Sequence, residues 1–66
     1  MVAETPAHYK GEHGIQPFDI IDAFKLGFNL GNVVKYVCRA DLKGEALKDL
    51  HKARVYLDRE IARRQK

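Results

Sequence analysis

Cysteine is almost missing from this chain, and two familiar nucleotide-binding motifs are missing altogether. Cys38 is the single cysteine among 66 residues, so no intramolecular disulfide can form and no cysteine pair can hold zinc. Such a cysteine content suits a reducing cytoplasm. The sequence contains neither a Gly-x-x-x-x-Gly-Lys-[Ser/Thr] loop nor a Gly-x-Gly-x-x-Gly loop. Any nucleotide chemistry must therefore rely on side chains instead of a backbone phosphate cradle.

Long apolar runs are absent as well. No stretch approaches the ~20 residues that a membrane span requires. The polar, turn-rich start "MVAETPAHYKGEHG" does not resemble a signal peptide. We therefore expect a cytoplasmic protein without a membrane partner. The chain is long enough for one domain at most, and its formal net charge of +3 favours anionic partners without specifying one.

The first part of the chain lacks helical periodicity. Residues 1–16 hold several turn-forming residues and little apolar content, so we expect an irregular arm there. Residues 17–66 form the expected single helical domain. Its first helix begins at Pro17, whose fixed φ suits the first helical position, and Lys25 followed by Gly27 indicates its end.

Two further helices follow in the pattern. Asn29 is expected to cap a second helix that runs from about Leu30 to Asp41. After Gly44, a long third helix runs from about Glu45 to Arg64. No segment shows convincing strand alternation. The predicted fold is all-α, with an irregular N-terminal arm followed by three helices, the last one long.

A stripe of large apolar residues on the third helix is the clearest core candidate. It consists of Leu47, Leu50, Leu57 and Ile61, with Ala46 and Ala53 beside it. The core is thin, because burial at about 25 cal/mol per Å² must offset about 1.5 kcal/mol for each ordered residue. We therefore expect a homo-oligomer with the third helix in the contact, because Val55 and Ala62 lie outside the stripe and are available to touch a second subunit.

Polar and cationic residues gather on one side of the second helix. At about 100° per residue they share an arc of about 100°, opposite the apolar side. They are Asn32, Lys35, Tyr36 and Arg39, and Lys43 continues the series. Such a row is either a solvated helix surface or an anion-binding site.

The third helix carries a second row with the same spacing, made of Asp49, Lys52, Tyr56 and Arg59. If the two helices are antiparallel neighbours, the two rows can face a common groove. Arginine presents a planar fork to phosphate oxygens, lysine supplies a mobile charge, and a phenol or an amide can contact a base or a sugar. A carboxylate can orient a neighbouring cation or accept a hydrogen bond from a ribose hydroxyl.

Other candidate groups for chemistry are weaker. His8, Glu12 and His13 superficially suggest a metal site, but three ligands in an irregular arm argue against one, and we predict none. Cys38 lies at the edge of an apolar face and is interpreted as a small buried hydrophobic residue. His51 is expected on the surface.

Five short segments, taken in order, resemble a known family. The segments are "HYK" at 8–10, "PFDIIDAF" at 17–24, "LGNVVKYVCRA" at 30–40, "KG" at 43–44 and "DLHKARVYL" at 49–57. The chain resembles small bacteriophage proteins that share a domain of unknown function, which also occurs in a podophage nucleotide kinase. The resemblance implies a phage origin, action in the host-cell cytoplasm and a link to nucleotides. That kinase converts deoxynucleoside monophosphates to diphosphates without a phosphate loop.

The resemblance also implies a set of nucleotide- or phosphate-binding residues. It adds two residues of the arm to those that helical spacing selects, and it assigns no catalytic residue. The complete set is His8, Tyr9, Asn32, Lys35, Tyr36, Arg39, Lys43, Asp49, Lys52 and Tyr56.

Three functions remain open. In a nucleotide kinase supplied by a nucleoside triphosphate donor, Lys35, Arg39 and Lys52 neutralise charge on the transferring phosphoryl group. A non-catalytic binder instead sequesters a nucleotide or a cyclic nucleotide signal of host defence, which suits a small chain without an evident general base. A nucleic-acid or protein-interaction module is disfavoured by the modest charge and the lack of a recognised DNA-binding motif. The sequence thus predicts a nucleotide-binding protein.

Overall fold

The structure, a computed structural model, describes residues 12–42 and 44–65. It contains a short 3₁₀ turn, η2, and three α-helices; the bounds are η2 (Glu12–Gly14), α1 (Pro17–Phe24), α2 (Phe28–Arg39) and α3 (Ala46–Arg64). The described ranges contain no strand. The prediction of an all-α fold with three helices and a long last helix is therefore confirmed.

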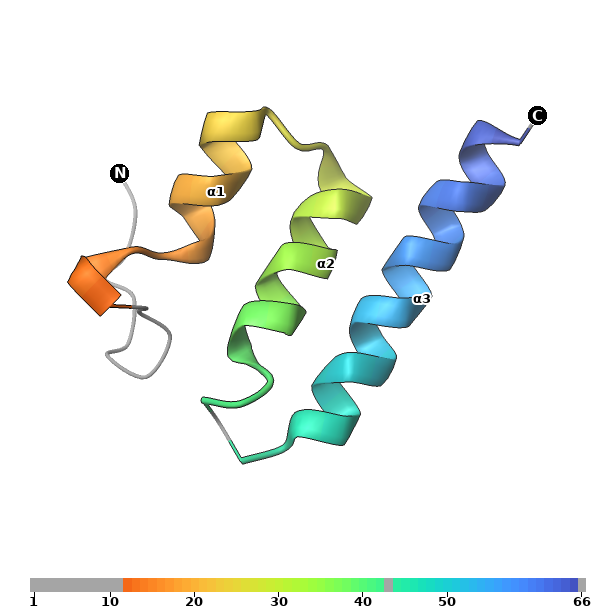
Figure 1. The fold of residues 1–66 in the computed structure, drawn as a ribbon. Coiled ribbons are helices and arrows are strands. Elements are labelled where there is room, and N and C mark those ends of the chain that lie inside the picture. Colours follow the sequence, from red (N-terminus) through yellow and green to blue (C-terminus); the bar gives the residue numbers. More distant parts are fainter. Residues whose placement is uncertain (1–11, 43, 66) are drawn as a thin grey trace.

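The three helices lie side by side and alternate in direction (Figure 1). α2 occupies the middle position, with α1 packed against one side of it and α3 against the other. Residues of α2 therefore link the two outer helices. None of the helices in the described ranges is both long and apolar enough to cross a membrane.

The start of α1 is as predicted, and its end differs in one detail. Pro17 is the first helical residue, and the backbone N–H of Gln16 donates to the Asp19 carboxylate over 2.8 Å. The last helical residue is Phe24, and the C-cap residue after it, Lys25, adopts the left-handed conformation with φ 55°. The N–H of Leu26 then donates to the carbonyl of Ile21 over 3.0 Å, which closes the helix end. Lys25 itself makes the turn for which the sequence offered Gly27.

The predicted bounds of the second helix were each about two residues late. Gly27 is the N-cap of α2, Phe28 is its first residue, and Arg39 is its last. Asn29 lies inside the helix and does not cap it. Its side-chain Nδ2 instead donates to Oε1 of Glu60 in α3 over 3.1 Å. A tertiary contact therefore uses the amide that the sequence suggested for a local cap.

Gly31 lies where α2 faces the Ile21 side chain of α1. It is the buried residue of α2, and a Cβ atom added there would lie 3.6 Å from Cδ1 of Ile21. That distance is an ordinary van der Waals contact. The glycine therefore allows α1 and α2 to pack closely, but an alanine at this position would also fit.

The prediction that the leucine stripe of α3 forms the core is wrong for the single chain. Leu47, Leu50, Leu57 and Ile61 are between 42% and 70% exposed. The buried residues of α3 are instead Asp49, Ala53 and Glu60. On average they lie about 95° around the helix from the stripe, so one edge of the polar row of α3 faces α2.

The burial of two carboxylates explains how α3 can take this orientation. Asp49 is 1% exposed and forms an ion pair with Arg39, whereas Glu60 is 6% exposed and binds Asn29 and two arginines of its own helix. Buried charges are tolerated in proteins when they are paired, as Asp49 is, and more readily when they are also hydrogen-bonded, as Glu60 is. These pairs give the α2–α3 interface a polar character that the apolar pattern did not predict.

Candidate functional site

Two tyrosines meet across the interface between α2 and α3. The ring centroids of Tyr36 and Tyr56 are 6.0 Å apart and the ring planes differ by 12°, so the rings are stacked. Such offset pairs contribute beyond the area that they bury. Helical spacing placed each tyrosine in a polar row, and the structure brings the two rows together. Each ring has one face against the other ring, so that face cannot stack on a base.

Three cationic groups surround the Tyr36 ring. Lys35 Nζ lies 5.1 Å, Lys52 Nζ 5.4 Å and Arg39 Cζ 5.7 Å from the ring centroid. All three distances are within the range of cation–π attraction. The cations come from both helices, so the α2–α3 packing creates a concentration of positive charge that neither helix has by itself.

Arg39 has a second role that the sequence left open. Its Nε lies 3.4 Å from Oδ1 of Asp49, and the carboxylate side chain is 2% exposed. Asp49 therefore orients Arg39, which is one of the two roles that the sequence suggested for a carboxylate in this row. No ion pair of Lys35 or Lys52 is found within residues 12–42 and 44–65, so their charges remain available to a ligand.

The remaining predicted residue of α2 is partly occupied by its own helix. Asn32 Nδ2 donates to the backbone carbonyl of Phe28 over 2.9 Å. That bond uses an N–H of the Asn32 side-chain amide, and the side-chain oxygen of Asn32 takes no part in it. Asn32 therefore keeps an acceptor for a base or a sugar and has less donor capacity than a free amide.

Two aromatic contacts extend the cluster beyond the predicted set. Phe28 is 68% exposed, and its ring meets Tyr56 edge-on at 5.8 Å between centroids. Arg59 Cζ lies 5.9 Å from the Tyr56 centroid. Sequence reasoning missed Phe28 because it began the helix two residues too late. Phe28, Asn32 and Tyr36 recur at intervals of four, which was the available signal.

Three predicted site residues cannot be placed. His8, Tyr9 and Lys43 lie outside the described residues. Of the weaker candidates, His13 is exposed in η2 and His51 is exposed on α3, as expected for the latter. No group of three metal-ligating side chains occurs within the described ranges.

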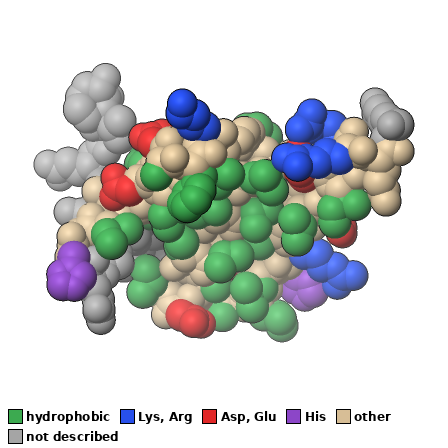
Figure 2. All heavy atoms as spheres, turned by 45° about the horizontal axis from the view of Figure 1, so that its top comes forward, with side chains coloured by type: hydrophobic (Ala, Val, Ile, Leu, Met, Phe, Trp, Pro, Cys, Tyr) green, Lys and Arg blue, Asp and Glu red, His purple; other side chains and the backbone are tan. Residues whose placement is uncertain are grey.

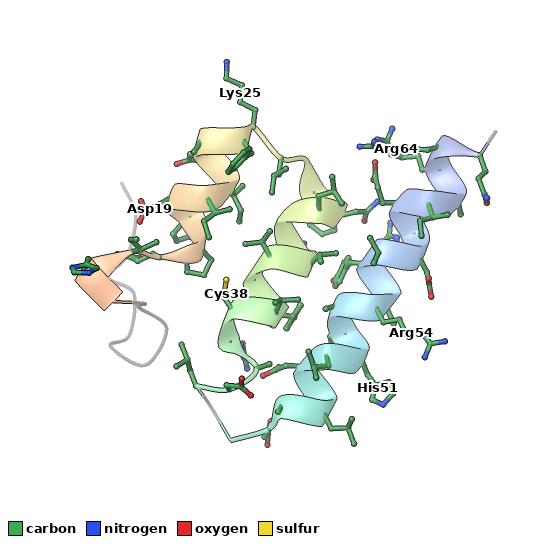
Figure 3. The ribbon with its side chains drawn as sticks, viewed as in Figure 1. Asp19, Lys25, Cys38, His51, Arg54 and Arg64 are labelled. Atoms are coloured by element: carbon green, nitrogen blue, oxygen red, sulfur yellow. The ribbon has the colours of Figure 1, made fainter. Side chains whose placement is uncertain are left out.

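Cys38 is half-buried and projects from α2 on the side of α1 (Figure 3). The sequence predicted a buried residue, so Cys38 is less completely buried than expected. The cysteine is on the opposite side of α2 from the neighbour that carries Tyr56.

A second charged cluster joins the start of α2 to the end of α3. Glu60 accepts hydrogen bonds from Asn29 over 3.1 Å, from Arg63 over 2.7 Å and from Arg64 over 2.5 Å. The hydrogen bonds from Arg63, Arg64 and Asn29 lower the pKa of Glu60 to about 2. The carboxylate is therefore ionised near neutral pH and saturated with donors. We assign it a structural role.

Comparison with known protein families matches residues 3–58 to a family described as proteins of unknown function, DUF3310. The chain belongs to this family. Searches of curated proteins and of solved structures gave no match. The DUF3310 match includes every residue predicted for the site and ends before Glu60. The first row and all of the second row except Arg59 thus lie within the family segment, and part of the Glu60 cluster lies beyond it.

Proposed function

We propose that this protein binds a nucleotide through its phosphate groups, on the face formed by Lys35, Tyr36, Arg39, Lys52 and Tyr56. The observation that carries the proposal is the convergence of three cations within 5.7 Å of one ring centroid. Like charges held so close repel one another, and an anion relieves that repulsion. Asp49 offsets part of the charge through Arg39.

The chemistry of the cations suits phosphate. Lys35 and Lys52 are mobile point charges on neighbouring helices, and they can close on an oxygen from two sides. Arg39 is held by Asp49 and provides a pre-oriented donor group. Phe28 presents an exposed aromatic ring beside Tyr56, where a base can stack. Phosphate at the cations with the base toward Phe28 is the pose that we propose.

Binding without catalysis is the form of this function that the described residues favour. Asp49 is paired with Arg39, one of the three cations, and its carboxylate is almost fully buried. A carboxylate so engaged is poorly placed to accept a proton from a substrate. Sequestration of a nucleotide or of a cyclic nucleotide signal therefore fits better than phosphoryl transfer from a triphosphate donor.

The resemblance to phage proteins supports the biological setting of the proposal. We propose a phage origin and action in the host-cell cytoplasm on that resemblance alone. The same resemblance keeps the nucleotide kinase as the second candidate, since the related kinase also lacks a phosphate loop. In that case Lys35 and Lys52 stabilise the transferring phosphoryl group.

A ligand screen tests the proposal. Thermal unfolding is measured with deoxynucleoside monophosphates, diphosphates, triphosphates, cyclic nucleotides and inorganic phosphate at matched ionic strength, because ligands that bind the folded state raise the midpoint. We expect a nucleotide to give a larger shift than inorganic phosphate. A shift for cyclic species alone indicates a signal binder, and labelled phosphate transferred from a triphosphate indicates the kinase.

Two outcomes contradict nucleotide binding. If no nucleotide shifts the midpoint at millimolar concentration, the cationic face is a solvated surface. If only long oligonucleotides bind, with steep salt dependence, the protein is a nucleic-acid module.

A further inference from the structure

The helix layer leaves one face apolar and without a partner in the single chain. Figure 2 shows a face on which hydrophobic side chains gather in the middle while lysine and arginine side chains lie toward the edge. The stripe of α3 is half-exposed or more open, and Val37 of α2 is 52% exposed. On α3, Lys52 and Arg59 lie well over 90° around the helix from the centre of this stripe, so the stripe is separate from the cationic site.

The exposed side chains indicate that this face is wide enough for a helix–helix contact. Leu47, Leu50, Leu57 and Ile61 are 42–70% exposed, and Val37 of the neighbouring helix is also more than half exposed. Each partner buries about 800 Å² in an interface of standard size, and apolar residues enrich the centre of such an interface.

The spacing along the stripe is that of a helix–helix seam. Residues 47, 50, 54, 57 and 61 alternate in steps of three and four, as the seam positions of a coiled coil do. Arg54 occupies the middle of the series, where an isolated charge is unfavourable. Arg54 is exposed and points away from α2 (Figure 3). Its Nε lies 4.0 Å from Oδ2 of Asp58 on the same helix.

We propose that a second copy of this chain covers the stripe, with the two α3 helices antiparallel about a two-fold axis between residues 55 and 56. In this register Leu50 faces Ile61 of the partner subunit. Arg54 faces Leu57 of the partner subunit and reaches Asp58 of the partner subunit. A parallel pair would instead set the two Arg54 side chains against each other, so charge selects the antiparallel arrangement.

A second copy is a better occupant than the N-terminal arm. Residues 1–11 contain three large apolar side chains, Met1, Val2 and Tyr9, which are too few for a surface of this size. Arg54 within the stripe and Asp58 beside it also have opposite charges, so a two-fold axis brings each of them close to the other residue of the second copy. Self-complementarity of this kind is the property that a symmetric dimer requires.

Sedimentation of the full chain and of matched variants provides the first test. We expect the mass of a dimer at micromolar concentration, and we expect Leu50→Glu to weaken association by at least about 100-fold, because the change acts twice in a symmetric interface. Val55→Glu is the control, since Val55 is an equally exposed aliphatic residue of α3 outside the stripe. A monomeric parent, or a Val55→Glu variant as weak as Leu50→Glu, overturns the proposal.

Mixing two charge variants tests the register without relying on the leucines. Arg54→Glu and Asp58→Arg each put like charges across the proposed interface, and each is expected to associate roughly 3- to 30-fold more weakly than the parent. In an equal mixture, opposite charges meet again between chains, although each chain keeps a like-charged pair within its own helix. Association in the mixture should return to the level of the parent. A mixture no tighter than either variant alone overturns the antiparallel register.

Discussion

Arg39 of α2 and Asp49 of α3 form an ion pair across the helix interface, with 3.4 Å between Nε and Oδ1. The carboxylate is almost fully buried, while the guanidinium remains partly open and lies 5.7 Å from the Tyr36 centroid. The pair therefore belongs both to the packing of the fold and to the cationic face. A single arginine connects the stability of the domain to its proposed binding site.

Removing the acid from this pair should destabilise the fold. Asp49→Ala breaks a largely buried ion pair, which typically costs about 3 kcal/mol. A domain this small has little stability to lose, so we expect the variant to be largely unfolded at room temperature. Urea unfolding followed by circular dichroism measures the effect. An Asp49→Ala midpoint equal to that of the parent would show that the pair contributes nothing.

Acid should weaken the Glu60 cluster in a defined pH window. The folded-state pKa of Glu60, about 2, is below its usual value near 4.5. The stabilisation is therefore complete above about pH 5 and is lost as the pH falls toward 2. The unfolding midpoint of the parent should therefore fall between pH 6 and pH 3. In Glu60→Gln the same fall should be smaller, because the titrating carboxylate is gone. Glu45→Gln, at an exposed acid beside Lys48, serves as the control and should leave that fall unchanged.

Alanine at Gly31 should stabilise the protein. Glycine inside a helix costs about 0.5–1 kcal/mol relative to alanine, and the added Cβ would meet Ile21 at an ordinary contact distance of 3.6 Å. We expect a thermal midpoint several degrees higher. Gly44→Ala provides the contrast, because Gly44 has φ 81° and a side chain there is strained. If Gly31→Ala destabilises the protein instead, α1 and α2 cannot shift enough to accommodate the added methyl group.

Neutralising either lysine at the Tyr36 ring should weaken nucleotide binding while the helices stay intact. A charge-assisted hydrogen bond contributes about 1.5–3 kcal/mol, so Lys35→Gln and Lys52→Gln should each lower affinity roughly 10- to 150-fold. Lys25→Gln is the matched control, since Lys25 points away from the helix layer at the end of α1 (Figure 3). Calorimetric titration with the nucleotide that gives the largest thermal shift measures the loss. Equal affinities in all three variants would place the ligand elsewhere.

Local signals predicted the helices well because their causes are local. Pro17 at the start of α1 and the region of Lys25 at its end follow from backbone preferences of single residues. The α3 bounds agree with the prediction to within one residue. The α2 start was misplaced because Asn29 is a good capping residue by type. Its actual partner, Glu60, is 31 residues away, and no local rule contains that contact.

The orientation of α3 could not be read from its apolar pattern. A helical stripe shows which side is hydrophobic, and it does not show whether the cover is a neighbouring helix or another molecule. Here the polar edge packs on α2 because Asp49 and Glu60 find cationic and amide partners there. The grouping of the two polar rows was anticipated from spacing. The Tyr36–Tyr56 stack was not anticipated, because it depends on the register between α2 and α3.

The Glu60 cluster bears on how this domain should be cut for expression. The family match ends at residue 58, and a fragment trimmed to that limit omits Glu60, Arg63 and Arg64. Asn29, in the first turn of α2, would then lose its acceptor on α3. The segment matched by the family is thus shorter than the set of residues whose contacts join α2 to α3. A fragment boundary for spectroscopy or crystallisation belongs after Arg64, at the end of the helix itself.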